Sequence, residues 1–349
     1  PRESIPGRGF TRHMRALVTF VLRIAIAATL LTGAAQAQRL TSQPDTHYKA
    51  IERMLTAPER DIDLVKAKLA IDQMIDPSID VEAISTQIDT MAKGLRDMLP
   101  AGANPGLKLE ALRHHIYKPT AWNGGRPFEY DLNDPYGENV RNKLLATYLR
   151  TRKGNCVSMP LLFILLGQKL GLDVTASNAP NHVFVQWRDV DGKLYNLETT
   201  SGAGFARDAW MRQQFDMTDE SLKSGIYMQP LSKKETVALM AGSLLEFYGK
   251  EGRQAQRRAL AALLLQHSPR NVAAILHERE AILEMWNQEF VRKYPTPGDI
   301  PQDKQARFLE LDTQIKALEA QAFKLGWRPP SEAREKQYRE IVRNAKQKN

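Results

Sequence analysis

The sequence predicts an α+β fold in which a central buried helix packs on a small antiparallel sheet, followed by an all-α C-terminal region. Three observations support this fold class. Residues 160–170 are apolar on nearly every side, which is typical of a buried helix. Residues 182–187 and 194–199 have strand-like composition and flank Asp191-Gly192, a hairpin signal. Beyond about residue 205, helical patterns alternate with prolines.

Length and composition bound the class of protein. The chain has 349 residues, enough for about two domains plus appendages at roughly 100–200 residues each. Hydrophobic residues make up 42% and charged residues 26%, which excludes a mainly disordered, collagenous or polytopic membrane protein. A single cysteine excludes a disulfide within the chain and a zinc site built from several thiolates.

The first 37 residues have the features of a targeting segment. Met14-Arg15 opens a basic region, an apolar run follows, and Ala35-Gln36-Ala37 is a small-residue cleavage signal. We expect a signal peptide from Met14 to Ala37, preceded by engineered or misassigned residues 1–13. The apolar run is shorter than the about 20 residues of a membrane span. The protein is therefore expected to be exported, periplasmic or secreted, with no stable membrane span after cleavage. An uncleaved anchor is the alternative.

The charge balance and the lone thiol indicate what the protein contacts. Removing residues 1–37, which hold five Arg and one Glu, lowers the net charge from +9 to +5. A surplus spread along helices is usually a solvated face, so no nucleic acid is expected as a partner. Exported proteins normally pair their cysteines. An unpaired cysteine in that setting suggests a reactive thiol, with an inert buried residue as the alternative.

Helical periodicity and turn signals set the remaining elements. Before the central helix, helices are expected over residues 46–55, 60–75, 81–98, 109–117 and 139–150, with loops over residues 100–107 and 123–136. In the C-terminal region they are expected over residues 234–248, 254–267, 272–294, 302–325 and 331–346, with residues 221–228 undecided. The predicted regions are residues 1–37, the helical N-terminal part with the core at 38–205, and the helical region 206–349.

One stretch of the C-terminal region has a repeat-like pattern. Residues 259–264 followed by Ser268-Pro269 are similar to the end of a tetratricopeptide repeat. A single match is not an array, because such repeats need about three neighbours for stability. A generic helical bundle is the other interpretation.

Cys156 is the candidate nucleophile. It lies between a Gly-Asn turn and the buried helix, with Arg152 and Lys153 nearby. A helix N-terminus carries about half a positive charge and free N–H groups. Such a setting favours the nucleophilic thiolate, and the same amides can hold an oxyanion.

Asn155 is a candidate N-cap of this helix and a possible secondary or oxyanion group. Pro160 is tolerated only in the first turn of a helix. The regular helix is therefore expected to start near Ser158.

A thiol nucleophile needs a base, and His182 is the candidate. It opens a predicted strand 26 residues after Cys156, directly after Ala179-Pro180-Asn181. A strand start beside the central helix is where an imidazole can reach the thiol. The other histidines lie upstream or on predicted helices: His13, His47, His114, His115, His267 and His277.

The third group follows from hairpin register. A two-residue loop at Asp191-Gly192 would place His182 and Glu198 on opposite faces. A three-residue loop with Gly192 in the left-handed position pairs Phe184 with Glu198 instead. Glu198 then becomes a diagonal neighbour of His182, within reach of its ring. We therefore select Glu198 to orient the imidazole, with Asn196, one pair further away, as a possible secondary group.

Four short motifs surround the candidate residues: Gly154-x-Cys156, Leu170-Gly171-Leu172, Asn181-His182-x-Phe184-x-x-Trp187 and Asn196-Leu197-Glu198-Thr199-Thr200. With these motifs the chain resembles a known family, the core-2 branch of the bacterial transglutaminase-like (papain-like cysteine) superfamily. This branch often carries a helical N-terminal part and tetratricopeptide-like helices. The resemblance covers about residues 60–205 and extends only loosely into the tail.

The resemblance implies a transglutaminase-like fold with Cys156 as nucleophile and His182 as base. Glu198 takes the position that Asp usually holds, a departure from the family pattern.

Together these features predict a thiol-dependent acyl-transfer enzyme, either an amide or peptide hydrolase or a transglutaminase-like enzyme. Its chemistry needs no metal and no cofactor. The expected substrate is a protein or peptide, and the C-terminal helices are a possible surface for a protein partner. The alternative is a catalytically inactive transglutaminase-like scaffold that binds a partner protein or a cell-wall component.

Overall fold

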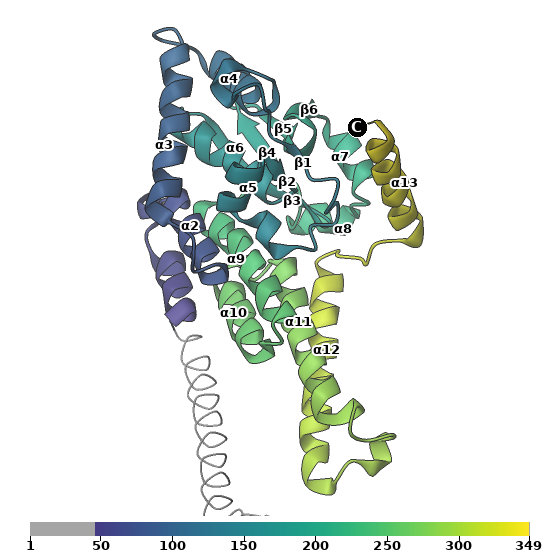
Figure 1. Ribbon diagram of the computed structural model, residues 1–349. Helices are drawn as coiled ribbons and strands as arrows, with labels where there is room; N and C mark the ends of the chain where they lie inside the picture. Colours follow the sequence, from purple (N-terminus) through teal and green to yellow (C-terminus); the bar gives the residue numbers. More distant parts are fainter. Residues whose placement is uncertain (1–45, 349) are drawn as a thin grey trace, which may run out of the picture. The chain divides into compact units, whose positions relative to one another are not determined.

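A computed structural model describes residues 46–348 (Figure 1). The predicted signal peptide and residues 1–13 lie outside the described residues. Export therefore stays a prediction, which N-terminal sequencing of the mature protein would check. Within residues 46–348, no helix combines the length and the apolar character needed to cross a membrane. Residues 51–348 form one compact unit that contains the sheet, the central helix and the C-terminal helices.

The centre of the fold is a buried helix against an antiparallel sheet, so the predicted α+β class is confirmed. Helix α6 is apolar on all sides and is buried from Ser158 to Gly167. It packs against β3 and β4 of the four-stranded sheet, whose order is β3-β4-β5-β6 (Figure 1). The short strand β6 was not anticipated. The bounds are α6 Ser158–Lys169, β3 Asp173–Ala179, β4 His182–Arg188, β5 Leu194–Glu198 and β6 Gly204–Ala206.

The β4–β5 hairpin has the predicted three-residue loop. Val185 lies opposite Leu197 and Gln186 opposite Asn196. The Asp189 amide bonds to the Lys193 carbonyl at 3.0 Å, which leaves residues 190–192 as the loop. Gly192 has φ +80°, the left-handed conformation that this loop requires. A slip of one residue would turn every side chain of β5, Glu198 included, to the opposite face.

Helices surround this centre on the N-terminal side, and a two-stranded parallel ladder, β1–β2, lies beside α6. The ladder pairs Tyr130 with Gly154. The bounds are α2 Leu64–Ile75, α3 Val81–Met98, α4 Pro105–Tyr117, β1 Glu129–Tyr130, η3 Val140–Lys143, α5 Leu145–Thr151 and β2 Lys153–Gly154, with short 3₁₀ turns η1 Glu59–Asp61 and η2 Ala121–Asn123.

Three predictions about these helices were wrong. The helix predicted over residues 60–75 begins only at Leu64, because the Asp63 side chain caps it there. The loop predicted through residue 107 ends earlier, because Pro105 fits the first helical turn and the Asn104 side chain caps it, accepting from the Leu107 amide at 2.8 Å. The single helix predicted over residues 139–150 is broken at Leu144. At the break, side chains of α2 take up backbone groups of residues 143 and 145 that a continuous helix would have used.

The C-terminal region is helical, as predicted, and successive helices from α9 to α12 pack against one another. Helix α9 also packs on α2 of the N-terminal part. The helix predicted to run to Tyr294 ends in a π-helical turn, and α7 was not anticipated. The boundary after residue 205 stays a prediction. The bounds are α7 Asp208–Gln214, α8 Asp219–Ser224, α9 Lys233–Lys250, α10 Gln254–His267, α11 Val272–Trp286, η5 Asn287–Val291, η6 Pro297–Asp299, α12 Gln302–Lys324 and α13 Glu332–Lys348.

Candidate functional site

Cys156 lies in the turn between β2 and α6, and its position depends on close packing at Gly154. A Cβ atom at Gly154 would lie 2.5 Å from Cε2 of Tyr148 and 2.8 Å from Cγ of Met159. Only glycine therefore fits between the Tyr148 ring and the start of α6. The Cys156 side chain is partly exposed, so its sulfur can be reached from solvent.

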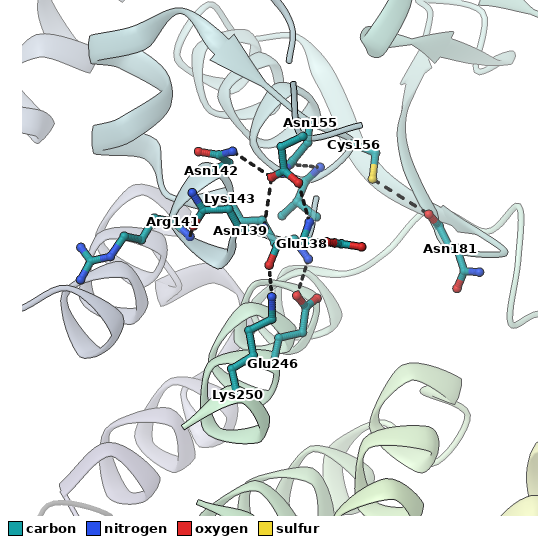
Figure 2. A network of polar contacts seen from close by, with 12 residues as sticks. Glu138, Asn139, Arg141, Asn142, Lys143, Asn155, Cys156, Asn181, Glu246 and Lys250 are labelled. Carbon is teal, nitrogen blue, oxygen red and sulfur yellow. Dashed lines mark hydrogen bonds and ion pairs between the residues drawn. The ribbon is translucent and has the colours of Figure 1, made fainter. Parts of the chain in front are cut away.

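Asn155 fixes the start of α6. Its Oδ1 accepts hydrogen bonds from the amides of Val157, at 3.0 Å, and Ser158, at 3.2 Å. Helix α6 begins at Ser158, as predicted. The side chain of Asn155 is buried, and its Nδ2 lies beside Gly137. Asn155 thus belongs to the polar network on one side of the turn, whereas the sulfur of Cys156 faces Asn181 on the other (Figure 2). This placement supports the capping role. Nδ2 of Asn155 has no hydrogen-bond partner among the described residues, and a role of Asn155 in holding an oxyanion stays a prediction.

The β3–β4 turn places His182 near the thiol of Cys156. Pro180 and Asn181 form this two-residue turn between Ala179 and His182. Asn181 has φ +53°, and proline followed by a left-handed residue is typical of a type II turn. The Asn181 carbonyl lies 4.0 Å from Sγ of Cys156 (Figure 2). His182 is the next residue and the first of β4, so the strand starts close to the thiol of Cys156.

Glu198 is locked against His182. Its Oε2 lies 2.7 Å from Nε2 of His182, and both side chains are largely buried, at 9% and 11% exposure. Its Oε1 accepts from the amide of Thr200 at 3.0 Å and from its hydroxyl at 2.6 Å. Glu198 thereby caps the 3₁₀ turn η4 (Thr199–Ser201) while holding the imidazole. With Nε2 engaged, Nδ1 is the ring nitrogen left for the thiol.

Burial and charge shift the pKa values of His182 and Glu198 in opposite directions. Burial of the His182 ring lowers its pKa, but the charge and hydrogen bond of Glu198 and a hydrogen bond to Cys156 outweigh it and raise the pKa to about 10. Burial raises the pKa of Glu198, but His182 and Thr200 together hold it below its usual value. At neutral pH the pair is therefore a carboxylate and an imidazolium, beside the thiol.

An aromatic side chain completes the surroundings of the imidazole. The ring of Phe215 stacks on that of His182, with centroids 4.5 Å apart and planes inclined by 14°. A stacked ring fixes the imidazole plane and favours its charged form. Phe215 follows α7, and no sequence signal linked it to the site. Thr200 was quoted only as part of a motif, although a hydroxyl two residues after a carboxylate is a recognisable local capping pattern.

Residues 82–241 match the family described as "Transglutaminase-like superfamily". This part of the chain is a transglutaminase-like domain. The match runs from α3 into α9 and contains Cys156, His182 and Glu198. It confirms the resemblance of the core, whereas the tetratricopeptide-like tail is not confirmed.

The domain also has a distant curated relative. The protein named "UPF0162 protein BU173" from Buchnera aphidicola subsp. Acyrthosiphon pisum (strain APS) is 23% identical over 184 residues, which are 51% of this chain and 63% of the relative. The chain thus spans slightly less than two thirds of that relative's length. No solved structure shows significant similarity.

Asn196, the other predicted secondary residue, lies elsewhere in the transglutaminase-like domain. It is buried, its Oδ1 accepts from Nε2 of Gln186 at 3.0 Å, and its Nδ2 donates to Asp208 at 2.6 Å. These bonds join the sheet to the start of α7, and they engage both the oxygen and the nitrogen of the Asn196 side chain. Within residues 46–348, no three or more His, Cys, Asp or Glu side chains converge as a metal site.

The His182–Glu198 pair is expected to make the stability of the domain depend on pH. A folded-state pKa of about 10, above the ordinary 6.5, means that the contribution is complete below pH 6.5 and is lost as pH rises toward 10. Relative to Glu198→Gln, the free energy of unfolding of the wild type should fall over this range by up to about 1.4 kcal/mol per pH unit. Urea unfolding of both proteins between pH 6.5 and 10 measures this change. A difference in the free energy of unfolding that does not vary with pH would contradict the ion pair.

Proposed function

We propose that the protein is a thiol-dependent acyl-transfer enzyme that uses Cys156, His182 and Glu198 as its catalytic triad. The observation that carries the proposal is the 2.7 Å contact between Nε2 of His182 and Oε2 of Glu198, with the thiol of Cys156 near enough to add to the rise of the His182 pKa. A nucleophile, a base and a group that orients the base make up the arrangement used for covalent acyl transfer.

The first step forms the acyl-enzyme. The thiolate of Cys156 attacks an amide carbonyl carbon, so that an S–C bond forms and the carbonyl oxygen becomes an oxyanion. As the C–N bond breaks, Nδ1–H of His182 donates its proton to the leaving amine. Glu198 holds the Nε2–H and stabilises the ring throughout. Backbone N–H groups beside Cys156 are the candidate oxyanion donors.

The second step releases the acyl group. Neutral His182 removes a proton from water or from an incoming amine, whose O or N attacks the thioester carbonyl, and the C–S bond breaks. Water gives hydrolysis and an amine gives amide exchange. Both outcomes share the acyl-enzyme, and the proposed substrate class is a protein or peptide.

The reactivity of Cys156 tests the proposal. We expect iodoacetamide to alkylate Cys156 at pH 6 at least about tenfold faster than free cysteine, whose thiol is then almost entirely protonated. The reason is that the adjacent imidazolium of His182 stabilises the thiolate. The measurement is the alkylation rate from pH 5 to 9, followed by intact mass, which is unambiguous because the chain has one cysteine.

Two comparisons make the result specific. His182→Gln removes the charged partner and should return the rate to that of an ordinary thiol. If the wild type is already as slow as His182→Gln at every pH, the thiol is inert. The transglutaminase-like fold would then serve as a scaffold that binds a partner protein or a cell-wall component.

A further inference from the structure

The last helix, α13, is only lightly attached to the body of the protein. None of its described side chains is fully buried, and those partly buried form one stripe: Arg334, Tyr338, Val342 and Ala345. The helix is otherwise polar, with six basic and three acidic residues between 332 and 348. Such a helix gains little from apolar burial, so its detachment costs little free energy.

The segment before α13 divides into an anchor and a hinge. Trp327 packs in the apolar cluster under the β3–β4 turn. The carbonyl of Gly326 accepts from the Thr218 hydroxyl at 2.8 Å, and that of Leu325 from the Ser224 hydroxyl at 2.6 Å. Residues 328–331, with Pro329-Pro330, are exposed. The end of α12 is therefore fixed, whereas residues 328–331 form an exposed connection between it and α13 (Figure 1).

Tyr338, the second residue of the α13 stripe, contacts the segment around β1, which pairs with the strand that leads to the thiol. The hydroxyl of Tyr338 donates to the carbonyl of Pro135 at 2.6 Å and lies 3.2 Å from the hydroxyl of Tyr130. Its ring meets that of Tyr136 edge-on, with centroids 5.2 Å apart. Tyr130 pairs with Gly154 in the β1–β2 ladder, two residues before Cys156.

Arg334, the first residue of the stripe, contacts the segment after α7, which lies against the imidazole. The guanidinium of Arg334 lies over the ring of Phe215, 5.9 Å from its centroid. Phe215 is the ring that stacks on His182. Ser331 approaches the carboxylate of Asp216 at 3.5 Å. Arg334 and Tyr338, one turn apart, thus contact both segments.

The electrostatics agree with this position. Burial raises the pKa of Tyr338, and the charge of Cys156 adds to that rise, against the hydrogen bond from Tyr130, which lowers it. Burial also raises the pKa of Tyr130, followed in size by the effect of Cys156. Both hydroxyls therefore lie within electrostatic range of the sulfur.

We propose that α13 is an autoinhibitory strap that bridges the segment around β1 and the segment after α7 and must swing out on residues 328–331 before a polypeptide substrate reaches Cys156. The claim that α13 inhibits the enzyme rests on the proposed acyl-transfer function, whereas the claim that α13 covers the thiol does not. Tyr338 is the main contact, because it alone makes two polar contacts and a ring contact with the segment around β1.

Size-dependent labelling of Cys156 in the full chain tests the strap. Iodoacetamide is small, and a maleimide carrying a long polyethylene glycol chain is bulky. We expect Tyr338→Ala to raise the bulky-reagent rate about tenfold, the effect of losing two hydrogen bonds and an aromatic contact from the closed state. The iodoacetamide rate should change little. Arg334→Ala, which breaks the opposite contact, should act in the same direction.

Arg343→Ala is the matched control, because Arg343 lies on the exposed face of the same helix. Equal ratios of bulky to small labelling in all four proteins would overturn the strap. Labelling of Cys156 needs no catalytic turnover, so the two proposals can fail separately. A raised ratio of bulky to small labelling, with no acyl-enzyme formed by any variant, would refute the proposed function but support α13 as a cover of the thiol. Acyl transfer from a polypeptide donor that is no faster in Tyr338→Ala than in the wild type would overturn autoinhibition.

Discussion

Replacing Glu198 by Gln is expected to slow acylation of Cys156 by about 10²–10⁴-fold, the range seen when a catalytic base loses its orienting carboxylate. The amide keeps the shape but removes the charge that holds the pKa of His182 at about 10. The imidazole is then largely neutral at pH 7, and its tautomer is no longer set by a carboxylate at Nε2. The measurement is the burst of p-nitrophenolate from p-nitrophenyl acetate, an activated acyl donor that needs no specific binding.

The chain offers a matched control for this substitution. Glu110 also faces a histidine, with Oε1 3.4 Å from Nε2 of His114, but both side chains are more than half exposed. Glu110→Gln changes the same chemistry in solvent, so the burst should be unaffected. Cys156→Ala should abolish the burst. A full burst rate in Glu198→Gln would show that the carboxylate takes no part in acylation.

The relation between the three candidate residues was predictable because local rules fix each of them. The loop before β5 needs a left-handed residue, which Gly192 supplies, and this choice alone sets the register that turns Glu198 toward His182. Pro160 and Asn155 fix the start of α6 in the same local way. Alternation along strands and capping of helices act over a few residues, so the sequence expresses them directly.

The contacts that complete the site were not predictable, because they join segments far apart in the chain. Phe215 stacks on His182 from a loop after α7, and Tyr130 comes from a two-residue strand that no alternation pattern reveals. Tyr338 meets Tyr130 across 208 positions. Nothing in the local pattern of α13 distinguishes a solvent-exposed helix from one that crosses the site.

The second large effect is expected at the buried ion pair of Lys68 and Asp72, which also bonds to the backbone on either side of Leu144. Asp72→Ala should lower the free energy of unfolding by about 3–5 kcal/mol, because it leaves the ammonium of Lys68 buried without a counter-charge. Both side chains are fully buried, and Nζ of Lys68 lies 2.5 Å from Oδ1 of Asp72. Burial raises the pKa of Asp72, and Lys68 and the Leu145 amide lower it only in part. Urea unfolding measures the loss.

An exposed pair of the same geometry is the control. Lys93 and Asp97 on α3 are also four residues apart and 2.5 Å apart, but their side chains are 70% and 51% exposed. Asp97→Ala should therefore cost no more than about 0.5 kcal/mol. Equal effects of Asp72→Ala and Asp97→Ala would contradict the argument from burial. The double replacement Lys68→Met with Asp72→Leu should recover part of the loss, because no charge stays buried.

The recovery should be incomplete, and the remainder connects this pair to the thiol. Lys68 donates to the Lys143 carbonyl at 2.9 Å, and Asp72 accepts from the Leu145 amide at 2.8 Å. Two apolar side chains leave both backbone groups unpaired, at about 1–3 kcal/mol each. These groups flank the break at Leu144, from which α5 leads to Gly154 and Cys156. The double variant should thus fold yet alkylate Cys156 more slowly, because the turn that presents the thiol has lost its fixed support.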